Sequence, residues 1–464
     1  MLKSFRGRTR GEWIALALFA LVVGYQVLVP PIVGLADNGD FDRVLGVFGV
    51  GAPADDQYQF VHLKYDYAPQ HYVGRNSINT EEALAGLAIV LNPPFNKRHA
   101  FDIRFLGAVH AALYILAFYL LQPLLRGFSK IARVLLYTAI IAVFGDVMYV
   151  SWMTTAYTDT SALLFLLLSA VLCLRVLAWK RRTDQIGFVV AAVLFTASKT
   201  AHSPLGLAIA GLLLIGGSSF GESQFGGKIL RGVGAALIVA AMAVTWTFLP
   251  ADYSETGMYS VMFYELLPYS NDVGRDLQQL GLDDSYRRCV GTYAYQEGNP
   301  FQDPQFVREF SKRASHLRVG WFLLRHPALA YRGVRYSLDF AGRQRPPMGN
   351  FARKAGLPAS TESRAFAWWS SLKRSAFEHQ GTVYAVYFLS LCALLCSALW
   401  WRCRRLFPAG ACLCLMALMA LGITSFGDAL EVARHFFLFN ALTDMILICA
   451  LAALLPAGRA TTAI

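Results

Sequence analysis

The sequence contains few charged residues. Asp, Glu, Lys and Arg together make up 16% of its 464 residues, whereas a soluble domain carries about 25%. Hydrophobic residues make up 56% and the mean hydropathy is +0.43. This balance excludes a soluble enzyme, a disordered chain and a fibre. It indicates a polytopic membrane protein, because ten spans of about 20 residues would still leave more than half of the chain for loops.

Motifs built on cysteine are also missing. Of eight cysteines, seven lie in or beside apolar runs, and Cys289 lies in a long polar segment. No CxxC motif pairs with a second one, so neither a disulfide framework nor a structural zinc site is indicated. No repeat of 20–50 residues is evident, which argues against a solenoid. The first apolar run, Trp13–Ala36, is long for a signal-peptide core, and we interpret it as a retained helix.

Acidic residues are outnumbered by basic ones, 30 against 42, which gives a formal net charge of +12. In a membrane protein, loop Lys and Arg set the topology and contact anionic lipid. We therefore expect membrane lipid as a partner and no nucleic acid.

Ten apolar runs predict ten transmembrane helices. The fifth and sixth runs are short and flank Ser198–Pro204, so they are either two spans or one broken helix. Two spans place nearly all loop Lys and Arg on one side, and the positive-inside rule then favours cytoplasmic termini. The predicted spans are 12–36, 104–124, 132–152, 160–179, 186–198, 204–218, 229–250, 382–401, 406–426 and 435–456.

The predicted fold is an all-α polytopic membrane protein with two extracytoplasmic loop regions that contain interfacial helices. An N-terminal module, 1–250, includes the loop 37–103; a large loop region, 251–381, follows; a C-terminal module, 382–464, completes the chain. Residues 316–340 alternate aromatic, aliphatic and basic side chains, which predicts one or two interfacial helices broken at Pro327. These helices are either a surface anchor or one wall of a groove for a lipid substrate.

Three carboxylates follow the first predicted span, in the sequence DNGDFDR. Asp37, Asp40 and Asp42 lie within six residues and precede Arg43. A base that takes a proton from a hydroxyl needs a placed carboxylate of this kind. The alternative is a solvated loop with an Asx turn.

Two further extracytoplasmic loops carry polar residues. The loop AYTDT places Tyr157 beside Asp159, which could instead cap the next helix. The turn ASKTAHSPL carries Lys199 and His202 between two short apolar runs. A lysine there is costly unless it faces water or an anion such as phosphate; the alternative is a snorkelling lysine.

The last polar cluster lies between the ninth and tenth spans. A helix would place Asp428, Glu431 and His435 on one face, whereas Arg434 could simply pair with Glu431. Asp146 and Asp444 are membrane-embedded carboxylates, which we expect to hold the bundle together. All these clusters fall on one side of the membrane. That arrangement suits a reaction between a membrane-borne anionic donor and an extracytoplasmic acceptor.

On these motifs (DNGDFDR, AYTDT, ASKTAHSPL and EVARH) the chain resembles the GT-C superfamily of membrane glycosyltransferases, which use polyprenyl-phosphate sugars. It is similar there to the hexose transferases of bacterial surface-glycan assembly. The resemblance implies a bacterial inner-membrane protein with an extracytoplasmic active site, and a glycan, lipid or protein acceptor. The catalytic base would be Asp40, with Asp37 and Asp42 as competitors for that role. Substrate-binding residues would be Asp42, Arg43, Tyr157, Asp159, Lys199, His202, Glu431, Arg434 and His435.

The resemblance implies no firm cofactor, although some relatives bind a divalent metal through loop acids, a role open to Asp37, Asp40 and Asp159. Two other functions stay open. A flippase of lipid-linked sugars would need polar residues reaching the bilayer midplane from both sides. A glycan polymerase or ligase would depend on extracytoplasmic arginines more than on an acid after the first span.

Overall fold

The computed structural model describes residues 7–51, 57–72, 78–92, 100–217, 225–249 and 251–456. The chain is an all-α polytopic membrane protein. Within the described residues, seven helices are long and apolar enough to cross a membrane. They are α2 (Arg10–Leu28), α5 (Arg104–Leu121), α8 (Thr158–Trp179), α11 (Phe225–Thr247), α18 (Gly381–Arg402), α19 (Phe407–Gly427) and α21 (Phe437–Leu454).

The other three predicted spans are shorter helices. They are α6 (Lys130–Phe144), α9 (Arg182–Thr196) and α10 (Leu205–Ile215), with 15, 15 and 11 residues. Each of the ten apolar runs therefore contains a helix. Residues 218 and 250, at the ends of two runs, lie outside the described residues.

Two predicted spans end earlier than expected. The helix α2 ends at Leu28, shortly before Pro30 and Pro31, which have no backbone N–H to continue a helix. The helix α6 ends at Phe144, and Asp146 then caps a separate short helix, α7 (Val147–Val150), by accepting a hydrogen bond from the Met148 N–H.

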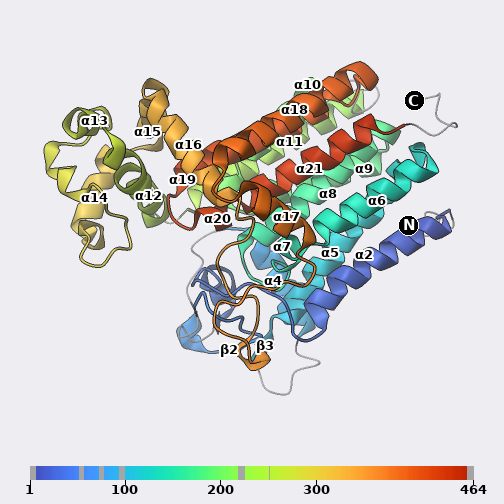
Figure 1. The fold of residues 1–464 in the computed structure, drawn as a ribbon, viewed down its shortest axis with the longest axis horizontal. Coiled ribbons are helices and arrows are strands. Elements are labelled where there is room, and N and C mark those ends of the chain that lie inside the picture. Colours follow the sequence, from blue (N-terminus) through green and yellow to red (C-terminus); the bar gives the residue numbers. More distant parts are fainter. Residues whose placement is uncertain are drawn as a thin grey trace.

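The helices alternate in direction, so their ends form two opposite faces of the bundle (Figure 1). At one face, Arg126 after α5 pairs with Glu12 of α2 at 2.6 Å. Arg402 of α18 donates there to the Ala453 carbonyl of α21 at 2.9 Å. The start of α2 and the end of α21 thus share one face, called here the terminal face; residues 1–6 and 457–464 lie outside the described residues. The opposite face, which carries both loop regions, is called the loop face.

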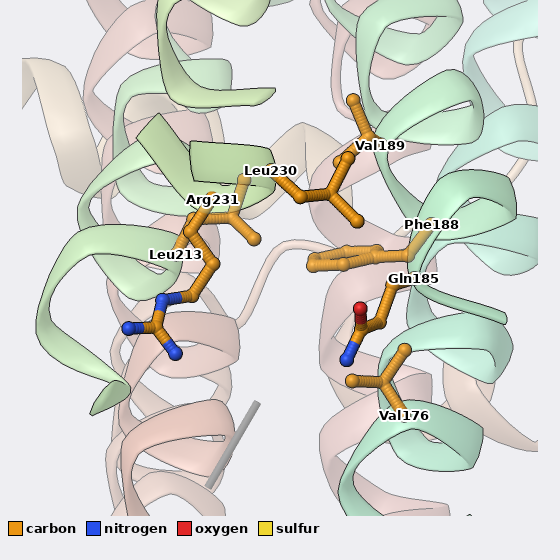
Figure 2. A pocket seen from close by; sticks show the side chains of 7 residues that line it. All are labelled: Val176, Gln185, Phe188, Val189, Leu213, Leu230 and Arg231. Carbon is orange, nitrogen blue, oxygen red and sulfur yellow. The ribbon is translucent and has the colours of Figure 1, made fainter. Parts of the chain in front are cut away.

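A small cavity lies between α8, α9, α10 and α11 near the terminal face (Figure 2). Its lining is apolar except for Gln185 and Arg231, and the Arg231 guanidinium donates to the Gly217 carbonyl. The cavity is therefore at the opposite end of the bundle from the polar loops.

The first loop region contains a three-stranded antiparallel sheet, which the sequence analysis did not predict. The strands β1 (Val50–Gly51), β2 (Lys64–Tyr67) and β3 (Ala100–Asp102) lie in this order, with Val50 opposite Tyr67 and Tyr65 opposite Phe101. The region also contains α3 (Asp42–Leu45) and α4 (Thr80–Leu91). Helix α4 packs against α5 and α8, so this region is fixed on the bundle.

The second loop region has a hydrophobic core of its own. Phe263, Leu277, Phe310 and Phe322 are buried together in it. The elements around this core are α12 (Ala251–Ser260), a π-helix (Val261–Leu266), α13 (Val273–Gln279), α14 (Pro304–Arg313) and α15 (His316–Arg325). Helix α16 (Pro327–Ala341) leads back to the bundle. Residues 316–340, predicted as one or two helices broken at Pro327, lie in the two helices α15 and α16.

A short helix, α17 (Trp368–Phe377), is held against the bundle by the two embedded carboxylates. Asp444 accepts hydrogen bonds from Lys373 Nζ at 2.9 Å and from Tyr149 Oη at 2.7 Å. Asp146 Oδ2 accepts from the backbone N–H groups of Trp369 and Ser370, at 2.8 and 2.9 Å. These acids thus fasten α17 to α7 and α21, which agrees with the structural role expected of them.

Candidate active site

The acidic segment after α2 is a tight turn. Asp37 Oδ1 accepts hydrogen bonds from the backbone N–H groups of Gly39 at 2.8 Å and Phe41 at 3.2 Å, which makes the Asx turn considered above. Gly39 has φ +102°, a conformation that side chains rarely adopt. Phe41 is buried against the ring of Tyr157, with ring centroids 4.7 Å apart. The turn is therefore fixed on the start of α8.

The carboxylates of this turn have different electrostatic surroundings. Asp40 pairs with Arg434, and with Arg43 at 3.2 Å. Burial raises the pKa of Asp40, but the charges of Arg434 and Arg43 outweigh it and lower this pKa to about 2. Burial raises the pKa of Asp37 to about 6, despite its two backbone hydrogen bonds. Of these two acids, Asp37 therefore has the proton affinity closer to that of a base working near neutral pH.

Arg434 is the centre of the ion pairs. It is 6% exposed and contacts Glu431 at 2.7 Å in addition to Asp40. Its guanidinium lies over the ring of Tyr157, 5.2 Å from the ring centroid. The Tyr157 hydroxyl donates to the Ala36 carbonyl at 2.9 Å and accepts from the Asn38 N–H at 3.1 Å. One arginine thus joins the first loop, the start of α8 and the segment before α21.

The expectation that one helix carries Asp428, Glu431 and His435 is wrong. Helix α19 ends at Gly427, and Glu431 has φ 48° before the short helix α20 (Val432–His435) begins. The break lets the Glu431 carboxylate accept two hydrogen bonds from Asn38 Nδ2, at 3.0 and 3.2 Å. Residues in this left-handed conformation are held by their surroundings and are common at functional sites.

His435 and Asp428 are a separate pair beside Arg434. The His435 Nε2 atom lies 3.5 Å from Asp428 Oδ2. Burial raises the pKa of Asp428, but the hydrogen bond and charge of His435 outweigh it and lower this pKa. The two residues are seven positions apart and do not lie on one helix. They meet because the chain leaves the helical conformation between α19 and α20.

A second ion-pair group lies at the first turn of α8. Lys199 Nζ contacts both oxygens of Asp159, at 2.9 and 2.8 Å, and His202 Nε2 lies 3.4 Å from Oδ1. Asp159 is 1% exposed and the Lys199 side chain 10% exposed. Because Tyr157 touches Arg434 and Asp159 is two residues later, the two ion-pair groups meet at the start of α8. The positive charge of Lys199 also contributes to lowering the pKa of Asp40.

The structure thus brings most predicted site residues together at the loop face. Asp42 is the exception: it is exposed at the start of α3. The joined residues are Asp37, Asp40, Arg43, Tyr157, Asp159, Lys199, His202, Glu431, Arg434 and His435.

Sequence reasoning missed two kinds of site residue. Asn38 and Tyr58 both hydrogen-bond the Glu431 side chain. Glu81 of α4 accepts from the Ser161 N–H at 3.0 Å and pairs with His110 at 2.9 Å, and both Glu81 and His110 are fully buried. Asn38 lies inside the acidic motif and could have been proposed. The partners of Glu81 lie on other helices, and no sequence spacing indicates them.

Within the described ranges, no group of three or more His, Cys, Asp or Glu side chains has the arrangement of a metal site. The acids considered as ligands are engaged otherwise. Asp40 pairs with two arginines, and both Asp159 oxygens contact Lys199.

Comparison with known protein families gives a match over nearly the whole chain. A family model described as "YfdI N-terminal transmembrane domain" matches residues 2–462. No curated protein and no solved structure matches the chain.

Proposed function

The chain belongs to the family of the YfdI N-terminal transmembrane domain, and on this premise we propose that it is an integral-membrane glycosyltransferase. It would move one sugar from a polyprenyl-phosphate donor to a glycan, lipid or protein acceptor. The convergence of Asp37, Asp40, Asp159, Lys199 and Arg434 at one end of the bundle carries the proposal. Buried charges at a membrane surface are costly and usually functional.

The two buried cations suit the phosphate of the donor. Lys199 and Arg434 are each neutralised by carboxylates, so a phosphate that enters competes with Asp159 and Asp40 for them. As the bond between the anomeric carbon and the phosphate oxygen breaks, the phosphate keeps the electron pair. Cations placed at that developing charge lower the barrier.

Asp37 is the base that we assign. The acceptor hydroxyl oxygen attacks the anomeric carbon, and its proton passes to the Asp37 carboxylate. With a pKa of about 6, Asp37 is ionised at neutral pH and still basic enough to take a proton. Asp40, with a pKa of about 2, would instead hold Arg434 in position.

We place the loop face outside the cytoplasm, in a bacterial inner membrane, with both termini inside. Basic residues at the helix ends of the terminal face support this orientation, because cytoplasmic loops are enriched in Lys and Arg. Arg126, Arg175, Arg231 and Arg402 lie at such ends.

The test is sugar transfer by purified protein in lipid nanodiscs. A radiolabelled polyprenyl-phosphate hexose is supplied with candidate acceptors, and the labelled product is followed. We expect transfer by the native protein and a loss of about 100- to 10,000-fold in Asp37→Asn. Transfer that is equally fast in Asp37→Asn refutes the assignment of the base. Transbilayer movement of the donor without transfer would instead support a flippase.

A further inference from the structure

Three arginines converge on one glutamate at the loop face, away from the ion pairs above. Glu362 contacts Arg343 at 3.2 Å, Arg345 at 3.4 Å and Arg374 at 2.8 Å. Arg343 and Arg345 follow α16, whereas Arg374 lies on α17 and donates to the Arg343 carbonyl at 2.9 Å. The cluster thus joins the segment after α16 to α17, which Asp146 and Asp444 hold on the bundle.

Each of the three guanidiniums has a buried nitrogen that finds no hydrogen-bond partner in the part of the chain that the structure describes. These atoms are Arg343 Nε, Arg345 Nε and Arg374 Nη2. The Arg345 side chain is only 7% exposed. Its Nη1 atom donates to the Ser363 carbonyl at 2.7 Å, whereas its Nε atom is one of the unpaired donors. Buried N–H donors are nearly always paired in proteins, because an unpaired one costs about 1–3 kcal/mol. Three such donors in one cluster are available to an acceptor that enters it.

The charge of the cluster also suits the binding of an anion. Three guanidiniums, which are always protonated, face Glu362 and the nearby Asp146. The Asp146 carboxylate is already occupied by three backbone N–H groups. Burial lowers the pKa of Arg345, and repulsion from Arg374 and Arg343 lowers it further against the attraction of the two acids. At least one positive charge is left uncompensated in a largely enclosed place.

Access to the cluster is open from the side of Arg343. Its side chain is 36% exposed, compared with 7% for Arg345. Trp368 and Leu372, one helical turn apart on α17, are 48% and 60% exposed. Exposed tryptophan and leucine side chains on a short helix are typical of a membrane interface. The cluster therefore lies where a lipid headgroup can reach it.

We propose that Arg343, Arg345 and Arg374 form a phosphate-binding site, which takes a phosphate ester of a lipid headgroup or a free phosphate ion. Arginine forks match the oxygens of phosphate, and charged hydrogen bonds of this kind are strong. Glu362 keeps the empty cluster assembled and competes with the anion. The site is distinct from Lys199 and Arg434 but close to them: the sulfur of Met348, three residues after Arg345, lies 3.7 Å from the Tyr157 hydroxyl oxygen.

The test is binding to the purified full-length protein in neutral detergent, without a sugar donor. Equilibrium dialysis measures radiolabelled inorganic phosphate, and native mass spectrometry measures dioctanoyl phosphatidic acid, with dioctanoylglycerol as the uncharged control. We expect phosphatidic acid to bind and dioctanoylglycerol not to bind. Phosphatidic acid that binds far more tightly than inorganic phosphate identifies a lipid headgroup as the source; similar affinities identify the free ion. Because no transfer is measured, failure here leaves the proposed activity untouched.

Matched variants locate the site. Arg345→Gln and Arg343→Gln each weaken binding by about 10- to 100-fold, whereas Glu362→Gln, which removes the competing carboxylate, strengthens it. Arg287→Gln is the control, because Arg287 pairs with Asp284 on the exposed surface of the second loop region. Arg343→Gln decides the matter if Arg345→Gln fails to fold. Affinity that is unchanged in Arg343→Gln, or equal for phosphatidic acid and dioctanoylglycerol, overturns the proposal.

Discussion

At the scale of single residues, the account depends on the different proton affinities of Asp37 and Asp40. Burial raises the pKa of Asp37 to about 6, whereas arginine charges lower that of Asp40 to about 2. A base acts only when deprotonated. The transfer rate should therefore be level above pH 7 and fall about tenfold per pH unit below pH 6. The pH–rate profile of the native protein checks this; a rate that stays level down to pH 4 contradicts it.

Asp40→Asn separates positioning from base chemistry. The variant leaves Arg434 with Glu431 as its remaining carboxylate in the ion-pair group. We expect a lower transfer rate and a weaker apparent affinity for the donor. The acid limb of the pH profile should persist, because the base is still present, with its midpoint moved below 6, because the charge of Asp40 contributes to raising the pKa of Asp37. If the acid limb of the pH–rate profile disappears in Asp40→Asn and persists in Asp37→Asn, then Asp40 is the base and Asp37 the positioning residue.

Lys199→Met tests the cation at the start of α8. Removal of one group that stabilises the leaving phosphate costs about 100- to 1,000-fold in the rate of transfer. Lys130→Met is the matched control, since Lys130 begins α6 at the terminal face. Lys199→Arg should recover part of the rate, because the charge is restored. Equal rates in Lys199→Met and Lys130→Met would remove Lys199 from the site.

The charged residues of the site could be predicted from the sequence, but the ion pairs that they form with one another could not. Asp40, Asp159, Lys199 and Arg434 were predictable because a charge beside an apolar run is costly and needs a reason. Their contacts were not predictable, since Asp40 meets Arg434 across 394 residues. Polar residues within soluble loops, such as Glu362 and Arg345, carry no comparable signal and were missed for that reason.

At the scale of elements, α17 is held by a buried ion pair. Lys373 and Asp444 are 2% and 0% exposed in their side chains. Asp444→Asn leaves Lys373 as an uncompensated buried charge and should lower the free energy of unfolding by about 3–5 kcal/mol. The double variant Lys373→Met with Asp444→Asn should recover most of this loss. Unfolding followed by circular dichroism in detergent measures both; a double variant less stable than Asp444→Asn contradicts the explanation.

Helices and strands were not equally predictable. A membrane-spanning segment must satisfy its backbone hydrogen bonds internally, so apolar runs such as those of α8 and α21 could only be helices. The sheet joins strands of two to four residues from positions 50, 64 and 100, and its register depends on contacts between distant segments. The non-helical conformation of Glu431 was not predictable, because the spacing of the polar residues around it fitted a continuous helix.

At the scale of the whole molecule, the two faces of the bundle should be exposed to different compartments. Asp284 on the loop-face region is 72% exposed in its side chain, and Arg405 is exposed beside α18 at the terminal face. In intact cells, an impermeant thiol reagent should label Asp284→Cys, and should label Arg405→Cys only after permeabilisation. Native Cys289 is buried and cannot serve as this probe. The reverse labelling pattern would invert the topology.

At this scale, the sum of the loop charges predicts which face of the bundle lies in the cytoplasm. Because this prediction sums many loop Lys and Arg residues, an error in one helix boundary, such as that at Phe144, does not reverse the predicted topology. The core of the second loop region could not be predicted, since residues such as Phe263 and Phe310 meet only in the folded chain.

Sided transfer tests the central claim most directly. Protein is reconstituted into liposomes with donor in the membrane, its orientation is read from Asp284→Cys labelling, and a membrane-impermeant acceptor is supplied in one compartment only. The account predicts that sugar reaches the acceptor in the compartment that faces Asp37 and Lys199, and that this product disappears in Asp37→Asn. Product formed only in the compartment that faces the terminal face would contradict the account.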